Sequence, residues 1–260
     1  MSEKKCRIEI IDGIRGFAII AMVIYHGLYD VNQIFSFDFN VFGINLFRLF
    51  EPLEPAFAGI FILLSGVSSR LSHSNFKRGL QVAVVAIILT IGTVIFSYVS
   101  RDNEIIYFGI LHFMAVAILI FVLLKPWLDK IPAYVSLPLW SVLFVVTYNI
   151  WRIYYIGIPG VFGFTLPSSI TNNPYLFAFG IPSPNFVSAD YFPLIPWIFI
   201  FLIGTILGVY VKQKRLPEKF YTTKVPFFAA AGRKTLIIYI IHQPIIFGIL
   251  YLIFNVILNR

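Results

Sequence analysis

The stretch "IDGIRGFAIIAMVIYHGLYD", Ile11–Asp30, decides the fold of this 260-residue chain. It is long and apolar enough to cross about 30 Å of hydrocarbon as an α-helix, yet it contains four ionisable side chains. On insertion scales, an Arg or Asp at the centre of such a helix costs about 2.5–3.5 kcal/mol. These four positions therefore need a structural or functional explanation.

The four ionisable side chains lie on one side of the predicted helix. With about 100° between successive residues, they fall within a sector of about 60°. They are Asp12, Arg15, His26 and Asp30. We expect this polar stripe to face the interior of a helical bundle or a wet cavity, where partners and water offset desolvation. The alternative is that Arg15 extends to the membrane surface and His26 only packs, which leaves the alignment unexplained. Asp30 is four residues from His26, in reach to hydrogen-bond the imidazole and fix its tautomer.

The composition places the whole chain in a membrane. Hydrophobic residues make up 59% of the sequence, charged residues 12%, and the mean hydropathy is +0.86. A soluble domain carries about 25% charged residues. Alternating barrel-type patterning is absent, so the sequence predicts an all-α, polytopic transmembrane helical bundle forming a single domain, 1–260. The predicted spans are about 11–30, 55–70, 79–99, 105–124, 133–155, 191–211 and 235–257.

The basic residues predict the orientation of the chain. Four of the 20 basic residues fall in outer segments if the N-terminus is cytoplasmic, namely Arg48, Arg101, Arg152 and Arg260. The other 16 fall inside: Lys4, Lys5, Arg7, Arg15, Arg70, Lys77, Arg78, Lys125, Lys130, Lys212, Lys214, Arg215, Lys219, Lys224, Arg233 and Lys234. This asymmetry predicts a multi-pass protein of the cell membrane with a cytoplasmic N-terminus. It also explains the net charge of +8 without a nucleic-acid partner. The single Cys6 excludes an intrachain disulfide.

One outer loop, 157–190, is long, contains no Lys or Arg, and is rich in Gly, Pro, Ser and aromatic residues. Loops beyond about 12–15 residues are usually functional or disordered, and this one is too apolar for disorder. We interpret it as a folded, partly re-entrant cap over an outward-facing cavity. The alternative is a loop that rests on lipid.

Further polar side chains accumulate near the outer ends of other spans. They are Glu51, Glu54, His112, Asp190 and the mid-membrane His242. Together they indicate a polar pathway through the bundle, although each histidine taken alone can be a core residue. No metal-ligand spacing occurs within one helix, and no nucleotide-binding glycine motif or hydrolase elbow is present, so no metal site is predicted.

Several motifs in order along the chain resemble one family of membrane acyltransferases. The first is the Arg, ten residues and a His of "DGIRGFAIIAMVIYH", and the last is "GRKTLIIYIIHQP". Between them lie "FILLSGVSSRLS", "GILHFMAVA" and "SADYFPLIPWIFIFLIGTILG". With "R-IE-IDGIRG" at the start, this order is most similar to the bacterial DUF1624 family. That family is related to the catalytic domain of heparan-alpha-glucosaminide N-acetyltransferase.

The resemblance implies that an acyl group passes from cytoplasmic acyl-CoA to a glycan or amino sugar across the membrane, with a histidine at the centre. His26, Asp30 and His112 are then the candidate catalytic residues, with Asp30 orienting His26. Glu54 and Asp190 are candidates for acceptor binding. The residues grouped with donor binding are Arg15, Arg70, Lys77, Arg78, Arg233, Lys234 and His242.

A neutral imidazole suits this chemistry, because it can take a proton from an amine or hydroxyl or accept the acyl group itself. Acetyl-CoA is expected as co-substrate, with no permanently bound cofactor. The expected partners are acyl-CoA, the acceptor, the lipid bilayer and a second copy in a homodimer. Two other classes stay open. One is a transporter or flippase with a buried Arg/His/Asp relay, although no inverted repeat is evident. The other is a structural or sensory membrane subunit.

Overall fold

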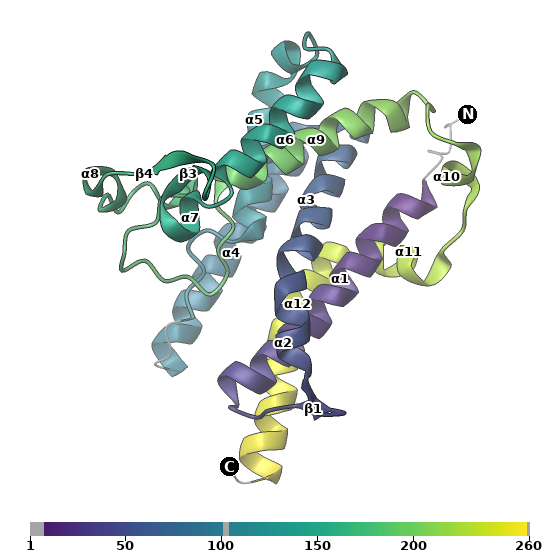
Figure 1. The fold of residues 1–260 in the computed structure, drawn as a ribbon. Helices are drawn as coiled ribbons and strands as arrows, with labels where there is room; N and C mark the ends of the chain where they lie inside the picture. Colours follow the sequence, from purple (N-terminus) through teal and green to yellow (C-terminus); the bar gives the residue numbers. More distant parts are fainter. Residues whose placement is uncertain (1–7, 101–103, 259–260) are drawn as a thin grey trace. The chain divides into compact units, whose positions relative to one another are not determined.

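The computed structural model describes residues 8–100 and 104–258. Cys6 and the basic residues Lys4, Lys5, Arg7, Arg101 and Arg260 lie outside these ranges. The described chain is mainly helical, with two short hairpins in its loops (Figure 1). Within these described ranges, seven helical segments are long and apolar enough to cross a membrane, which confirms the predicted all-α, polytopic fold.

The main helices follow one another as expected. Their bounds are α1 Glu9–Tyr29, α3 Glu54–Leu71, α4 Asn75–Ser100, α5 Ile110–Leu128, α6 Ala133–Thr147, α9 Leu194–Lys212 and α12 Thr235–Tyr251. Short π-helical turns extend the first and the last of these, namely η1 Asp30–Ile34 and η4 Leu252–Ile257. The shorter elements between them are β1 Asn40–Val41, β2 Ile44–Asn45, α2 Leu46–Phe50, η2 Glu51–Leu53, α7 Ile150–Ile153, β3 Tyr155–Ile158, β4 Phe162–Thr165, α8 Ser168–Thr171, η3 Phe177–Phe179, α10 Glu218–Thr222 and α11 Pro226–Arg233.

The fourth and sixth spans begin later than predicted, and one local contact explains both shifts. The segment before α5 is extended and pairs with the segment before α9 through a bridge between Phe108 and Tyr191. Two backbone hydrogen bonds support it, Ala189 N to Ile105 O at 3.1 Å and Phe192 N to Phe108 O at 3.0 Å. Hydropathy alone assigned these residues to helices, because an apolar extended segment has the same composition as a helix end.

The described chain divides into two compact units. Unit 1 contains the two ends of the sequence, Met1–Phe61 and Leu216–Arg260, and unit 2 contains Ile62–Arg215. Helix α3 therefore begins in unit 1 and ends in unit 2. The expectation of a single domain over 1–260 stays a prediction.

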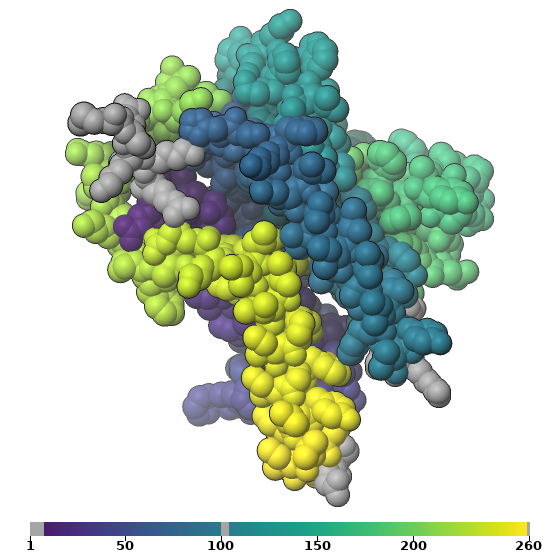
Figure 2. Space-filling view, turned by 180° about the vertical axis from the view of Figure 1, so that it is seen from behind, coloured from purple at the N-terminus to yellow at the C-terminus, as the bar shows by residue number. Residues whose placement is uncertain are grey.

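In unit 1, α1 packs closely along α11 because glycines line the contact. A Cβ added to Gly16 would lie 1.8 Å from the carbonyl oxygen of Phe228. A Cβ added to Gly232 would lie 1.8 Å from the carbonyl oxygen of Asp12. The "GIRG" and "GRKT" motifs therefore meet backbone to backbone. Helix α12 also contacts α1, and Figure 2 shows it in yellow at the surface. Its outward side chains are apolar, including Ile237, which is 59% exposed, as expected of a lipid-facing helix.

In unit 2, α4 packs on α5 and α6 packs on α9. The second half of α3 crosses α9 at Gly66 and Gly204, where an added Cβ would lie 2.1 Å from a carbonyl oxygen of the other helix. The predicted cap, 157–190, is folded, as expected: β3 and β4 form an antiparallel hairpin that pairs Tyr155 with Thr165 and Ile158 with Phe162. Re-entry of this segment into the membrane stays a prediction.

Candidate active site

Two histidines from distant parts of the sequence meet in unit 1. The imidazole rings of His26 on α1 and His242 on α12 have centroids 5.1 Å apart and an interplanar angle of 52°. His242 is buried, with 8% of its surface exposed, and His26 is half-buried. One reacting group can therefore contact both rings. The predictions grouped these histidines separately, His26 with catalysis and His242 with donor binding, and the structure brings them together.

The hydrogen bonds of His242 fix its tautomer. Its Nδ1 lies 2.7 Å from the backbone carbonyl oxygen of Tyr239. A carbonyl oxygen only accepts hydrogen bonds, so Nδ1 carries the proton and Nε2 of the neutral ring carries a lone pair. Nε2 is buried, and no group in the described ranges, 8–100 and 104–258, bonds to it. A buried, unpartnered acceptor beside a second imidazole is the arrangement expected of a general base or a nucleophile awaiting substrate.

Asp30 does not hydrogen-bond His26 as the i, i+4 spacing predicts. The fully buried Asp30 carboxylate accepts two hydrogen bonds from the Gln243 amide, at 2.8 Å to Oδ1 and 3.0 Å to Oδ2. His26 makes ring contacts with Tyr25 and His242 and has no hydrogen bond within the described part of the chain. Asp30 thus ties α1 to α12 beside the histidine pair.

Gln243 is the residue that sequence reasoning missed in unit 1. It follows His242 directly in the "HQP" motif, and consecutive helical residues point in directions about 100° apart. The two side chains therefore reach different groups on α1, His26 and Asp30. The signal available in the sequence was an uncharged amide side chain next to His242 in a mostly apolar helix.

The structure places His112, one of the predicted catalytic residues, in a set of local hydrogen bonds. It lies in the first turn of α5, where Nδ1 accepts a hydrogen bond from the Gly109 backbone N–H at 3.2 Å. Its Nε2 lies 3.0 Å from Thr90 Oγ1. That hydroxyl donates to the Ile106 carbonyl oxygen at 2.7 Å, so Nε2 is the donor to it. Both ring nitrogens are used in capping α5 and holding α4 to it.

Asp190, predicted to bind the acceptor, also caps α5. Its Oδ2 accepts a hydrogen bond from the Ile110 backbone N–H at 3.1 Å, and a carboxylate at this end is favoured by the helix dipole. The other predicted acceptor residue, Glu54, is the first residue of α3 and is half-buried. Acceptor binding by either residue stays a prediction.

The predicted donor residues are divided between the units. In unit 1, Arg15 bonds Asp12 at 2.9 Å, and Arg233 and Lys234 are exposed at the junction of α11 and α12. In unit 2, Lys77 is exposed, and Arg78 donates to Ser65 Oγ at 3.1 Å.

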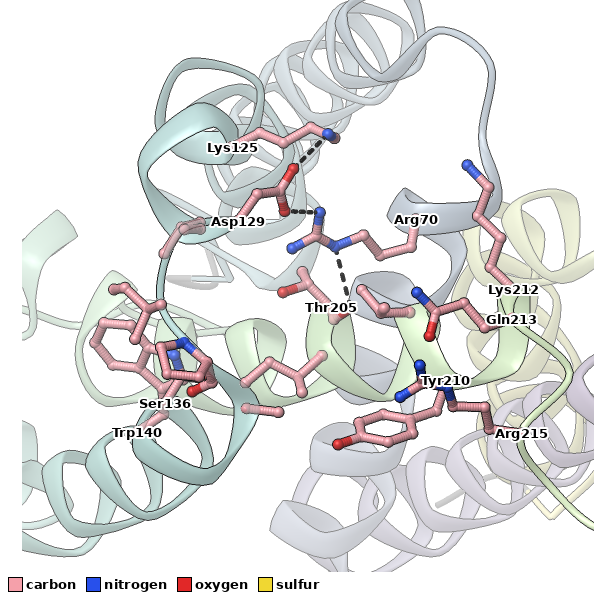
Figure 3. Close-up of a pocket in the computed structure, with 16 residues that line it drawn as sticks. Arg70, Lys125, Asp129, Ser136, Trp140, Thr205, Tyr210, Lys212, Gln213 and Arg215 are labelled. Carbon is pink, nitrogen blue, oxygen red and sulfur yellow. Dashed lines mark hydrogen bonds and ion pairs between the residues drawn. The ribbon is translucent and has the colours of Figure 1, made fainter.

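Arg70, another of the predicted donor residues, lines a cavity. This cavity lies within unit 2 and has a volume of about 690 Å³ (Figure 3). Cavities of about 300–1,000 Å³ are usual for small-molecule sites. We call it the basic pocket, because four of its lining residues are cations: Arg70, Lys125, Lys212 and Arg215. Tyr210, Gln213 and Trp140 also line it.

The basic pocket was visible in the sequence only as cytoplasmic charge. In the sequence, three of its cations served only to predict the orientation in the membrane, namely Lys125, Lys212 and Arg215. Hydropathy does not indicate which loops lie side by side, so these residues were not assigned to a site. Among the described residues, no group of three His, Cys, Asp or Glu side chains is placed to hold a metal ion.

The fold and these sites define a polytopic α-helical membrane protein with a pair of adjacent histidines. The sequence profile of a family described as "Heparan-alpha-glucosaminide N-acetyltransferase, catalytic" matches residues 7–244. The chain belongs to this family, which is a family of membrane acetyltransferases. Searches of curated proteins and of solved structures gave no match.

Proposed function

We propose that this protein transfers an acetyl group from cytoplasmic acetyl-CoA to an amine or hydroxyl of an extracytoplasmic glycan or amino sugar. The observation that carries the proposal is the His26–His242 pair, with its buried and unpartnered Nε2. Family membership supports the acetyl group as the unit transferred. The proposed setting is the cell membrane with a cytoplasmic N-terminus, supported by the distribution of basic residues.

The reaction needs a base at the acceptor. Nε2 of His242 would take the proton of the acceptor amine or hydroxyl as the new bond forms to the acetyl carbonyl carbon. The carbon–sulfur bond of the thioester then breaks, and the CoA thiolate leaves and is protonated. His26, beside it, would hold the reacting group in place or carry the acetyl group transiently.

The basic pocket of unit 2 would bind the phosphate groups of the donor. Arg70 is the most enclosed of its cations, with 9% of its side chain exposed, and a guanidinium suits phosphate oxygens. Lys125, Lys212 and Arg215 add positive charge. In this proposal, Arg15 has a different role from the predicted donor contact, because its guanidinium is paired with Asp12.

Acetyl transfer can be measured directly with purified full-length protein, radiolabelled acetyl-CoA and glucosamine or its oligosaccharides as acceptors. We expect His242→Ala and His26→Ala each to lower the rate about 10²–10⁴-fold, the usual effect of losing a general base. His73→Ala is the matched control, because His73 is an exposed loop residue and should keep the wild-type rate.

Two outcomes would contradict the proposal. One is near wild-type turnover in both histidine variants, which would remove the pair from the chemistry. The other is acceptor movement across sealed vesicles without acetylation, which would indicate a transporter. Label retained on the protein in the absence of acceptor, and lost in His26→Ala but not His242→Ala, would identify His26 as the acyl carrier.

A further inference from the structure

The basic pocket of unit 2 contains an acidic side chain between two of its four cations. Asp129 accepts hydrogen bonds from Arg70 Nη1 and, at 2.7 Å, from Lys125 Nζ (Figure 3). The two cations bind different oxygens of the carboxylate, Oδ1 and Oδ2. This is the arrangement in which two cations hold adjacent oxygens of a phosphate group.

The position of Asp129 is unfavourable apart from these ion pairs. It is the C-cap residue of α5, where the helix dipole disfavours a negative charge. Burial also opposes its ionisation, but the hydrogen bonds and charges of Lys125 and Arg70 outweigh burial and hold the pKa of Asp129 below its usual value. The carboxylate therefore stays ionised at neutral pH. Its side chain is 39% exposed, so water and solutes can reach it.

Arg70 does not depend on Asp129 for its orientation. Its Nε donates to the Thr205 carbonyl oxygen at 3.2 Å, and its guanidinium lies 4.9 Å from the centre of the Phe121 ring. Helix α9 allows this close approach because residue 208 is glycine, where an added Cβ would lie 2.8 Å from Arg70 Cβ. Within the part of the chain that the structure describes, Nη2 of Arg70 has no hydrogen-bond acceptor.

The remaining cations leave an excess of positive charge in the pocket. Arg215 lies 5.9 Å from the centre of the Tyr210 ring, and Lys212 has no ion-pair partner among the described residues. One carboxylate against four cations leaves the pocket at +3. A single phosphate that replaces Asp129 gains little binding free energy, because one anion takes the place of another. A diphosphate gains more, because it replaces Asp129 and also reaches the cations that Asp129 does not bind.

We propose that Asp129 is a displaceable counter-ion that occupies a phosphate position between Arg70 and Lys125, and that the remaining cations of the pocket favour ligands with a second, closely spaced phosphate group. The proposal rests on the proposed function only in identifying the diphosphate source as the acyl-CoA donor. Free pyrophosphate offers the same chemistry without the acyl chain.

The test is the affinity of purified full-length protein for CoA, inorganic pyrophosphate and inorganic phosphate, measured by titration calorimetry. We expect Asp129→Asn to bind CoA and pyrophosphate about tenfold more tightly than wild type, because the internal competitor is removed. Glu218→Gln is the control, because it removes one negative charge from α10, which does not line the pocket.

A second variant and a double variant keep the test decisive. Asp129→Ser serves if Asp129→Asn is poorly folded by size-exclusion chromatography. In an Arg70→Ala background, Asp129→Asn should tighten binding less than it does in the wild type, because only the competition for Lys125 remains. Unchanged or weaker binding in both Asp129 variants would overturn the proposal and make Asp129 a residue that positions the cations. That outcome would leave the proposed function intact if acetyl transfer depends on His242. Conversely, the pyrophosphate titrations test the role of Asp129 even if no acetyl transfer is found.

Discussion

Each of the three intramembrane histidines has a different set of hydrogen bonds. His112 uses both ring nitrogens within unit 2, whereas Nε2 of His242 is buried without a partner in the described residues. A general base must have a free lone pair within reach of its substrate, and His112 has none, because both of its ring nitrogens are hydrogen-bonded. Substitutions at these two positions should therefore affect different properties of the protein.

We predict that His112→Ala lowers stability and leaves the chemistry intact. The variant loses a helix cap, which costs about 0.5–2 kcal/mol, and leaves Thr90 without one of its hydrogen bonds. The measurement is the thermal unfolding midpoint in detergent, together with the acetylation rate per folded molecule below that midpoint. A rate reduced 100-fold at unchanged stability would return His112 to the active site.

At this scale, the sequence predicted the enclosure of the polar side chains on α1 better than it predicted their partners. The polar stripe of α1 is enclosed, with Asp30 fully buried and Asp12 13% exposed in its side chain. The partner of Asp30 was wrong because helical spacing reports only neighbours on the same helix. Gln243 is 213 positions away, and its approach depends on how α12 packs.

Among the elements, the contact of α1 with α11 depends on glycine more than any other contact in unit 1. We predict that Gly16→Ala destabilises the protein by about 1–3 kcal/mol, because its methyl group would overlap the Phe228 carbonyl. The measurement is again thermal unfolding of the purified protein.

Gly27→Ala is the matched control for this prediction. Gly27 lies on the same helix, and among the described residues nothing lies within 4 Å of its added Cβ. Alanine is about 1 kcal/mol better than glycine inside a helix, so this variant should be as stable as wild type or more so. Equal effects of the two substitutions would show that the close contact of α1 with α11 does not form.

The elements also show where hydropathy stops being informative. Span number followed from apolar length, but the start of α5 did not, because the paired extended segment before it is equally apolar. The hairpin of β3 and β4 was not predicted in detail either. Its strand glycines, Gly157 and Gly163, pair with each other, and both have positive φ. In the sequence, such glycines are equally compatible with an irregular glycine-rich loop and with a hairpin.

For the whole molecule, the basic residues and the cap make a prediction about sidedness. With seven spans and the N-terminus inside, Ser74 should be cytoplasmic and Ser169 outside. Both positions are exposed, and cysteine is close to serine in size. With Cys6 replaced, Ser74→Cys should react with an impermeant maleimide only in inside-out vesicles, and Ser169→Cys only in right-side-out vesicles. Labelling of Ser169→Cys in inside-out vesicles would reverse the orientation.

The division into two units could not be predicted from the sequence. The seven spans form one continuous series by hydropathy, and no linker rich in charge or glycine marks a boundary. The boundary lies inside α3, whose composition does not change there. Glycine contacts and side-chain shape decide which apolar helices pack together, and these can be seen only in the three-dimensional structure.

The bond between Asp30 and Gln243 also sets an order of events during synthesis. At about 5–20 residues per second, the ribosome needs roughly 10–40 s to pass from Asp30 to Gln243, 213 positions later. During that interval α1 lies in the bilayer with its buried carboxylate lacking this partner. We therefore expect the nascent first helix to be held by the insertion machinery until the last helix arrives. A chain that stops before α12 should leave α1 a substrate for membrane quality control.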